Sequence, residues 1–235
     1  MANNYFQFKQ FLIEQDNCAM KVCTDSVLLA ALTTVNNLNY ALDIGTGTGI
    51  LALMLAQKNP TLEFDAIEID ELAFLQASNN FSKSKFGTQI KPHLVALQQF
   101  VANKQYDLII TNPPYFISKN NYSITDLQRA KARHDNDLTF EELIDSVMKL
   151  LNDMGEFSLI LPIKEATIFK ELATKKGLFV IKNIYIKPKL TKFSNRIVMV
   201  FSRQQIDEIT EEFIVYNEDN SQTDAFKELT KNYYL

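Results

Sequence analysis

The sequence has few of the side chains from which disulfide frameworks and metal sites are built. Its 235 residues include only two cysteines, Cys18 and Cys23, and two histidines, His93 and His134. Two cysteines are too few for a disulfide framework and lack zinc-type partners, so we expect reduced thiols and no metal. This cysteine usage is in keeping with a cytoplasmic protein.

Long apolar runs are missing as well. The polar and aromatic stretch 1–9 lacks the apolar region of a signal peptide, and no later run is long enough to cross a bilayer. The net charge of −4 means that any nucleic-acid site must be a local patch. Length and composition fit one domain spanning 1–235, with 1–35 as an N-terminal extension, and we expect a monomer without membrane contacts.

Alternating strand and helix signals predict the fold. Apolar runs typical of buried strands lie at 40–44, 63–68, 90–97, 107–111 and 156–161. Two further runs, 178–186 and 197–201, predict a hairpin-like pair that closes the sheet. We therefore expect an α/β fold: a doubly wound, mostly parallel Rossmann-like sheet with an antiparallel edge strand.

A glycine-rich turn follows the first of these strands. The run 45–49 reads Gly-Thr-Gly-Thr-Gly, and a helical stretch begins at Ile50. Glycines allow a tight turn and close approach of the backbone to a ligand, while the helix N-terminus offers free N–H groups. The third glycine comes earlier than in a dinucleotide fingerprint, and Asp43 stands just before the turn. Its carboxylate disfavours a pyrophosphate and attracts a cationic amino-acid group, which favours S-adenosylmethionine over NAD.

An acidic residue ends the next strand. Glu68 follows the glycines by about 20 residues, the spacing at which a carboxylate accepts hydrogen bonds from a ribose diol. Asp70 is the competing candidate, but its place before a helical run predicts a helix N-cap instead. We therefore expect Glu68 to bind the ribose.

The stretch 107–115, Asp-Leu-Ile-Ile-Thr-Asn-Pro-Pro-Tyr, predicts a buried strand that stops at a rigid elbow. In open α/β sheets ligands bind at the carboxyl ends of the strands. The side-chain oxygen of Asn112 and the carbonyl of Pro113 could accept both hydrogens of a planar amino group, and Tyr115 offers a flat ring. The alternative is a plain surface turn, since Asn and Pro are common there.

Four further segments contain either the N-terminus of a predicted helix or side chains that could bind a ligand or RNA. Thr24 or Asp25 can cap a helix over roughly 25–34, which is compatible with a ligand-facing loop. Thr139 and Glu142 have the spacing of a capping box. The long polar loop 116–137 is either a substrate-contacting lid or a solvated face. The connection 187–196 is either an RNA-binding patch, with Phe193 able to stack a base, or a solvated loop.

The site motifs resemble those of class I S-adenosylmethionine-dependent methyltransferases that modify a planar amino or amide nitrogen. They are Asp43-x-Gly45-x-Gly47-x-Gly49, Glu68 and Asn112-Pro113-Pro114-Tyr115. Three branches of these enzymes share the Asn-Pro-Pro-Tyr pattern: DNA adenine enzymes, rRNA guanine enzymes and release-factor glutamine methyltransferases. The stretches 6–11, 20–31 and 225–235 are more specifically similar to the bacterial tRNA(valine) adenine-N6 methyltransferase family, which methylates the adenosine just 3′ of the anticodon.

This resemblance and the motifs together define the expected site. Asn112, Pro113, Pro114 and Tyr115 would be catalytic. The residues expected to bind S-adenosylmethionine are Lys21, Thr24, Asp25, Asp43, Gly45, Thr46, Gly47, Gly49, Glu68, Ile69, Leu97 and Asn112. The residues expected to contact tRNA are Arg129, Arg133, Lys187, Lys189, Lys192 and Arg196.

The chain departs from the family pattern at two positions. Cys23 replaces a usual glycine, which suggests a negative φ there. Ala96 replaces a usual aspartate that receives the adenine amino group of the cofactor, so adenine must be held by backbone near Leu97 and by apolar packing. The lost hydrogen bond would cost about 0.5–1.5 kcal/mol of cofactor affinity.

The expected reaction is transfer of a methyl group to the exocyclic nitrogen of adenine without a general base. Acceptors around the amine favour a nitrogen whose lone pair faces the methyl group, and they bind more strongly as positive charge develops. The alternatives are a protein glutamine N5-methyltransferase, an rRNA or DNA amino-group methyltransferase, and an idle cofactor- or RNA-binding module. An NAD-dependent oxidoreductase is disfavoured by the glycine spacing and by Asp43.

Overall fold

The computed structural model describes residues 3–18, 20–113 and 138–235. Several predicted site residues therefore lie outside the described residues: Pro114, Tyr115, Arg129, Arg133 and the rest of the loop 116–137. Asn112 and Pro113, which begin the elbow, lie inside them. Within the described ranges no helix is long and apolar enough to cross a membrane.

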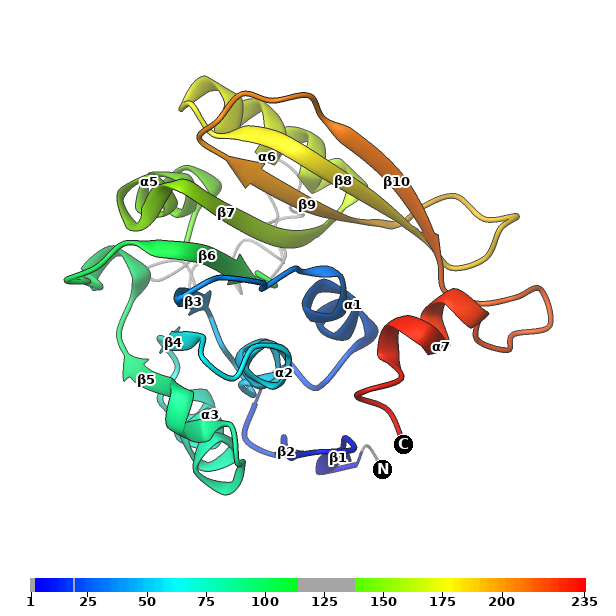
Figure 1. The fold of residues 1–235 in the computed structure, drawn as a ribbon, viewed down its shortest axis with the longest axis horizontal. Coiled ribbons are helices and arrows are strands. Elements are labelled where there is room, and N and C mark those ends of the chain that lie inside the picture. The colour runs from blue at the N-terminus through cyan, green and yellow to red at the C-terminus, as the bar shows by residue number, and fades with distance from the viewer. Residues whose placement is uncertain (1–2, 19, 114–137) are drawn as a thin grey trace, which may run out of the picture.

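An eight-stranded sheet forms the centre of the molecule (Figure 1). Its strands in spatial order are β10 (Ile209–Ile214), β8 (Phe179–Lys187), β9 (Arg196–Ser202), β7 (Leu151–Pro162), β6 (Tyr106–Thr111), β3 (Tyr40–Ile44), β4 (Glu63–Glu68) and β5 (Ile90–Leu94). Neighbouring strands pair in parallel except at β9, which runs antiparallel to both β7 and β8. The predicted doubly wound, mostly parallel α/β fold is confirmed.

The antiparallel strand lies inside the sheet and not at its edge, where the sequence had suggested it. The hairpin-like pair of β8 and β9 exists, but β9 inserts between β7 and β8, and β10 then adds to β8 in parallel. Sequence pattern cannot distinguish these arrangements, because both place apolar, β-branched residues in strands buried on both faces. The strand predicted over 90–97 also ends early, at Leu94.

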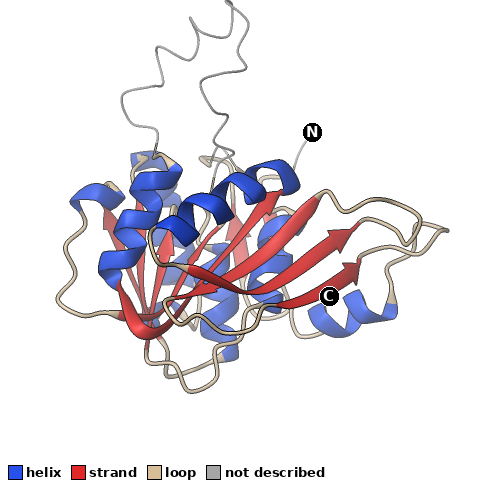
Figure 2. Cartoon of the chain, turned by 90° about the horizontal axis from the view of Figure 1, so that it is seen from above, coloured by secondary structure: helices blue, strands red, loops and turns tan. Residues whose placement is uncertain are grey.

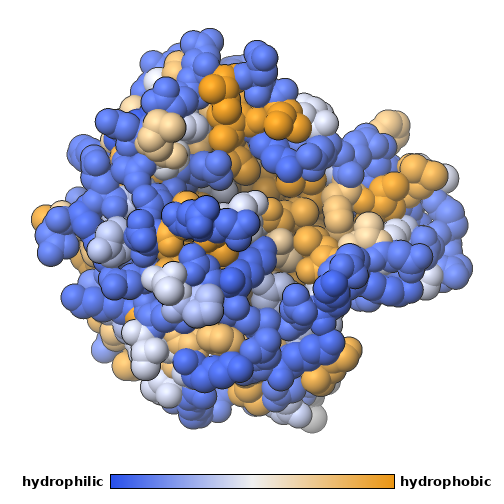
Figure 3. All heavy atoms as spheres, viewed as in Figure 1, coloured by the Kyte–Doolittle hydropathy of each residue, from blue (hydrophilic) through white to orange (hydrophobic). Residues whose placement is uncertain are grey.

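Helices cover both faces of the sheet (Figure 2). One core cluster includes side chains of α1 (Thr24–Leu32), α2 (Ile50–Lys58), α3 (Glu71–Lys83) and α7 (Asp224–Thr230), and the other includes those of α5 (Phe140–Leu150) and α6 (Ile163–Lys175). Two short 3-10 turns, η1 (Gly87–Gln89) and η2 (Leu97–Gln99), connect these elements. Hydrophilic side chains cover most of the face seen in Figure 3.

Strand β6 contributes to both cores. Leu108 and Ile110 belong to one cluster and Ile109 to the other, and all three are fully buried. This is the alternation of side chains expected of a strand, since successive Cβ atoms point to opposite faces. The central position of β6 therefore fixes where Asn112, which follows it, leaves the sheet.

The N-terminal segment forms an antiparallel hairpin of β1 (Tyr5–Gln7) and β2 (Leu12–Glu14). It packs on α3, where the side chain of Asn80 bonds both the amide and the carbonyl of Glu14 at 2.9 Å. It also meets the end of the chain, because the Lys9 amide donates to the Tyr233 carbonyl at 2.8 Å.

Candidate functional site

The carboxyl ends of β6, β3 and β4 lie side by side at one edge of the sheet. In the parallel register Asp43 is paired with both Ala66 and Ile110. The buried hydroxyl of Thr111 donates to the Ile44 carbonyl at 2.8 Å, which joins the last residue of β6 to the last residue of β3. The elbow at Asn112, the glycine turn and the end of β4 are thereby brought to one place.

The glycines of the turn have positive φ angles and different surroundings. Gly45 has φ 67° and Gly47 has φ 55°, and a Cβ on either would meet nothing closer than 4.0 Å. At Gly49, with φ 83°, a Cβ would lie 2.4 Å from the ring of Phe81. The first two glycines therefore present backbone to open space, whereas the third allows α2 to pack closely against α3.

Asp43 lies beneath the turn and is fully buried. Its Oδ2 accepts a hydrogen bond from the Thr46 hydroxyl at 2.6 Å, while its Oδ1 has no hydrogen-bond partner among the described residues. Burial raises the pKa of this carboxyl to about 7, although the Thr46 hydroxyl and the Ala52 amide act in the opposite direction. Through its hydrogen bond with Thr46, Asp43 stabilises the conformation of the turn.

Glu68 links the end of β4 to the glycine turn. Its Oε2 accepts from the amide of Gly47 at 2.9 Å, and its Oε1 accepts from the amides of Ile69 and Asp70 at 2.8 and 3.1 Å. Asp70 itself caps α3, with Oδ1 accepting from the Ala73 amide at 2.8 Å. The predicted cap is confirmed, and of Glu68 and Asp70 it is Glu68 whose carboxylate contacts the glycine turn.

Apolar residues follow the ends of β4 and β5, which are joined by the hydrogen bond from the Val95 amide to the Glu68 carbonyl at 2.9 Å. Ile69 is 51% exposed, which is unusual for an isoleucine directly after a buried strand. Leu97 is buried at the start of the turn η2, for which Ala96 is the N-cap residue. That adenine packs against these two apolar side chains, without an acidic side chain at position 96, stays a prediction.

Asn112 is half-buried, and its side-chain nitrogen faces α1 and the residues just before this helix. Its Nδ2 donates to the Ser26 hydroxyl at 2.9 Å and lies 3.7 Å from the Met20 sulfur and 3.9 Å from the Cys23 sulfur. Sequence reasoning identified the run that includes these residues but did not single out Ser26. No local signal could have done so, because the contact joins positions far apart in the sequence.

Helix α1 begins at Thr24 with Cys23 at the N-cap and no side-chain cap, so the prediction that Thr24 or Asp25 caps this helix is wrong. Asp25 instead pairs with Arg196, whose Nε lies 2.8 Å from Asp25 Oδ2. The φ of Cys23 is −133°, which confirms the negative value expected where the family has glycine. Lys21 reaches the carbonyl of Asn3 at 3.4 Å.

The basic connection 187–196 is largely engaged within the protein. Lys187 pairs with Glu212 at 2.7 Å, Lys189 donates to the Glu218 carbonyl at 2.9 Å, and Arg196 pairs with Asp25. Within the described part of the chain, Lys192 is the one predicted RNA contact of this connection whose side chain has no partner. Its neighbour Phe193 is 97% exposed.

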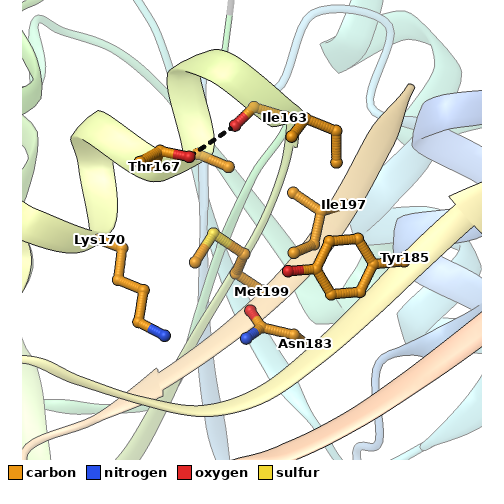
Figure 4. Close-up of a pocket in the computed structure, with 8 residues that line it drawn as sticks. Ile163, Thr167, Lys170, Asn183, Tyr185, Ile197 and Met199 are labelled. Carbon is orange, nitrogen blue, oxygen red and sulfur yellow. Dashed lines mark hydrogen bonds between the residues drawn. The ribbon is translucent and has the colours of Figure 1, made fainter. Parts of the chain in front are cut away.

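A separate small cavity of about 60 Å³ lies between α6 and the strands β8 and β9 (Figure 4). Thr167, Lys170, Asn183 and Tyr185 supply its polar groups. None of the residues that line it is a predicted site residue. Among the described residues, no cluster of histidine, cysteine or acidic side chains could hold a metal ion.

Comparison with known proteins shows the family. The model of the methyltransferase small domain matches residues 18–165. A tRNA1(Val) (adenine(37)-N6)-methyltransferase of Dyadobacter fermentans is 38% identical, over 99% of this chain and 98% of the relative. A protein of the same name from Histophilus somni is 40% identical, over 98% of this chain and 97% of the relative.

Solved structures agree on the fold. A predicted O-methyltransferase from Agrobacterium tumefaciens superposes with a TM-score of 0.68 at 15% identity, over 89% of this chain and 96% of that one. The sequence-based assignment is confirmed: the chain belongs to the family of tRNA1(Val) (adenine(37)-N6)-methyltransferases.

Proposed function

We propose that this chain uses S-adenosylmethionine to methylate the N6 atom of an adenosine in tRNA. The adenosine is the one just 3′ of the anticodon of a valine tRNA, position 37 in the names of the relatives. The single observation that carries the proposal is the placement of Asn112 at the end of β6, beside the glycine turn and Glu68.

The residues at this edge fit S-adenosylmethionine. Gly45 and Gly47 leave room for a ligand against the backbone, and the partnerless Oδ1 of Asp43 lies beneath them. Glu68 would accept from the ribose hydroxyls, which requires that its hydrogen bond from the Gly47 amide give way. When bound, S-adenosylmethionine supplies an electrophilic methyl group on a sulfonium.

The chain's own residues would hold the adenine. The Oδ1 of Asn112 makes no hydrogen bond within the described ranges and is available to accept from the adenine amino group. The Pro113 carbonyl would accept the second hydrogen. Both contacts strengthen as the amine becomes positive, which is the condition for lowering the barrier. Tyr115 would stack on a base splayed out of the anticodon loop.

We expect local basic loops to recognise the RNA, because the net charge is acidic. Lys192 and Phe193 are a cation and an aromatic side chain on the exposed part of the 187–196 connection, and Arg129 and Arg133 of the loop 116–137 are further candidates. Residues 1–35 would complete the cofactor site within a single domain spanning 1–235. We expect this domain to act as a monomer in the cytoplasm.

The test uses labelled S-adenosylmethionine and bulk tRNA from a strain that lacks this protein, followed by nucleoside analysis. We expect the label as N6-methyladenosine in a valine tRNA. If tRNA stays unlabelled while a protein fraction takes up label, the substrate is a glutamine side chain and the proposal is wrong. Label in rRNA or DNA alone would also contradict it.

A further inference from the structure

We propose that Ser26 is a positioning residue that holds the Asn112 amide with its nitrogen turned away from the substrate and its oxygen toward it. The inference rests on the proposed function, in which Asn112 accepts a hydrogen bond from the adenine amine. Ser26 lies in the first turn of α1, is 5% exposed, and has its hydroxyl oxygen 2.9 Å from Asn112 Nδ2.

An asparagine amide has a donor end and an acceptor end of nearly the same shape. Half a turn about the last side-chain bond exchanges them. If Nδ2 faced the adenine, two N–H donors would meet and the amine would be repelled. Catalysis by Asn112 therefore needs an element that holds Nδ2 away from the substrate.

The surroundings of Nδ2 supply that element. Besides Ser26, the sulfur atoms of Met20 and Cys23 lie 3.7 and 3.9 Å away. A thioether has no hydrogen to donate, so Met20 is compatible with the nitrogen end and not with the oxygen end. The Ser26 hydroxyl and the Cys23 thiol can accept or donate, so Met20 selects the nitrogen end and Ser26 then holds it, which leaves Oδ1 on the other side of the amide.

Among these three acceptors the hydroxyl is the strongest and the closest, since sulfur accepts only weakly. Ser26 can accept from Asn112 and still donate its own hydrogen to Cys23 Sγ, which lies 3.6 Å from the hydroxyl oxygen. Its backbone belongs to a helix whose first turn is tied to β9 through the Asp25–Arg196 pair at 2.8 Å. A hydroxyl on such a rigid element suits the task of fixing an amide.

The test is Ser26→Ala in the full chain, assayed by single turnover with tRNA at saturating S-adenosylmethionine. We expect the rate of methyl transfer to fall about tenfold, the loss typical of one hydrogen bond. The affinity for S-adenosylmethionine, measured by calorimetry, stays within twofold of wild type. Ser26→Thr, which keeps a hydroxyl, restores most of the rate.

Ser78→Ala is the matched control. It removes another buried helical hydroxyl, but Ser78 Oγ has no hydrogen-bond partner among the described residues. We expect it to leave the rate unchanged. A second readout needs no substrate: the side-chain amide NMR signals of Asn112, assigned by their loss in Asn112→Ala, should move in Ser26→Ala toward those of a free amide.

The outcomes separate this inference from the proposed function. If Asn112→Ala is inactive while Ser26→Ala keeps the wild-type rate, the inference is wrong and the function stands. If Ser26→Ala loses S-adenosylmethionine binding, the role of Ser26 is structural and the inference also fails. If Asn112→Ala keeps the wild-type rate, the proposed function of Asn112 itself fails.

Discussion

Asn112 directly follows the apolar strand β6 and is the residue proposed to bind the adenine amine. Thr111 binds the Ile44 carbonyl at 2.8 Å and so holds the backbone before it, while Ser26 holds its side chain. A residue fixed at both backbone and side chain can act with little reorganisation when charge develops on the substrate.

Asn112→Ala should therefore lower the rate of methyl transfer by at least about a hundredfold, because the main acceptor for the amine is gone. S-adenosylmethionine should still bind, since Glu68 and the glycine turn are untouched. Single-turnover assays and calorimetry measure the two effects. Asn103→Ala, on an exposed residue that precedes β6, is the matched control; wild-type turnover by Asn112→Ala would contradict the mechanism.

Glu68 and Asp70 can be separated by paired substitutions. Glu68→Ala should weaken binding of S-adenosylmethionine by about tenfold or more, since the ribose loses its carboxylate. Asp70→Ala should leave that affinity unchanged but destabilise the fold by roughly 0.5–2 kcal/mol, the usual loss of a helix cap. Calorimetry and chemical denaturation distinguish them. Unchanged affinity in Glu68→Ala would mean that another side chain binds the ribose.

Asp43 should make stability depend on pH in an unusual direction. Burial raises its pKa to about 7 in the folded protein from the ordinary value of 3.8. Between these values the folded state holds a proton that the unfolded state has lost, so stability falls as pH rises from about 4 to 7. Above that range the stabilisation by the protonated carboxyl is fully lost. The linkage between proton binding and folding sets this loss at a few kcal/mol at most.

Asp43→Asn removes this titration while keeping the shape of the side chain. The free energy of unfolding of the variant minus that of wild type should therefore be larger at pH 8 than at pH 5. Urea denaturation of both proteins at the two pH values measures the difference. An equal difference between the two proteins at both pH values would show that Asp43 titrates normally.

At the scale of elements, the glycine turn leaves space beside its backbone and also allows two helices to pack closely. The sequence alone does not show which glycine serves which role. Gly45 and Gly47 face open space, whereas Gly49 lies against Phe81 of α3. The spacing of the run predicted the turn correctly, because positive φ is a local demand that glycine meets. Which glycine serves packing depends on α3, which comes later in the chain.

Gly49→Ala should consequently destabilise the protein by about 3 kcal/mol or more, from the strained φ and the clash with a ring 2.4 Å away. Gly177→Ala is the matched control, because Gly177 has φ 81° but open space around its Cα. It should cost only about 1–2 kcal/mol. Thermal and urea denaturation measure both; equal losses would mean that Phe81 moves aside freely.

Other elements show the same division between local and distant causes. The capping box of Thr139 and Glu142 is present as predicted, since both partners lie within one turn. The place of β9 in the sheet was not predictable, because strand order depends on how a chain of buried strands packs and not on any one strand. The partner of Asp25 was missed for the same reason: Arg196 is distant in the chain.

For the whole molecule, the acidic net charge and the paired cations limit how RNA can bind. Lys187 and Arg196 are neutralised by Glu212 and Asp25, so the 187–196 connection presents less free charge than its composition suggests. Lys192 and Phe193 are both exposed, and we expect them to contact a phosphate and a base. Binding should weaken as salt concentration rises.

Lys192→Ala should accordingly weaken tRNA binding and reduce the slope of log affinity against log salt by about 0.7–0.9, the contribution of one phosphate contact. Lys187→Ala should change this slope less, because its amine already pairs with Glu212 at 2.7 Å. Filter binding at several salt concentrations compares the two. Equal slopes for both variants and wild type would exclude Lys192 from the interface.

The sequence by itself indicated the family and determined the features whose causes are local: the glycine turn after a buried strand, the end of β6 just before Asn112 and Pro113, and the caps of α3 and α5. Only the tertiary structure decided that β9 lies inside the sheet, that Arg196 pairs with Asp25, and that Ser26 holds Asn112. The physical reason is that turns and caps are set by neighbouring residues, whereas strand order and side-chain partners are set by how the whole core closes.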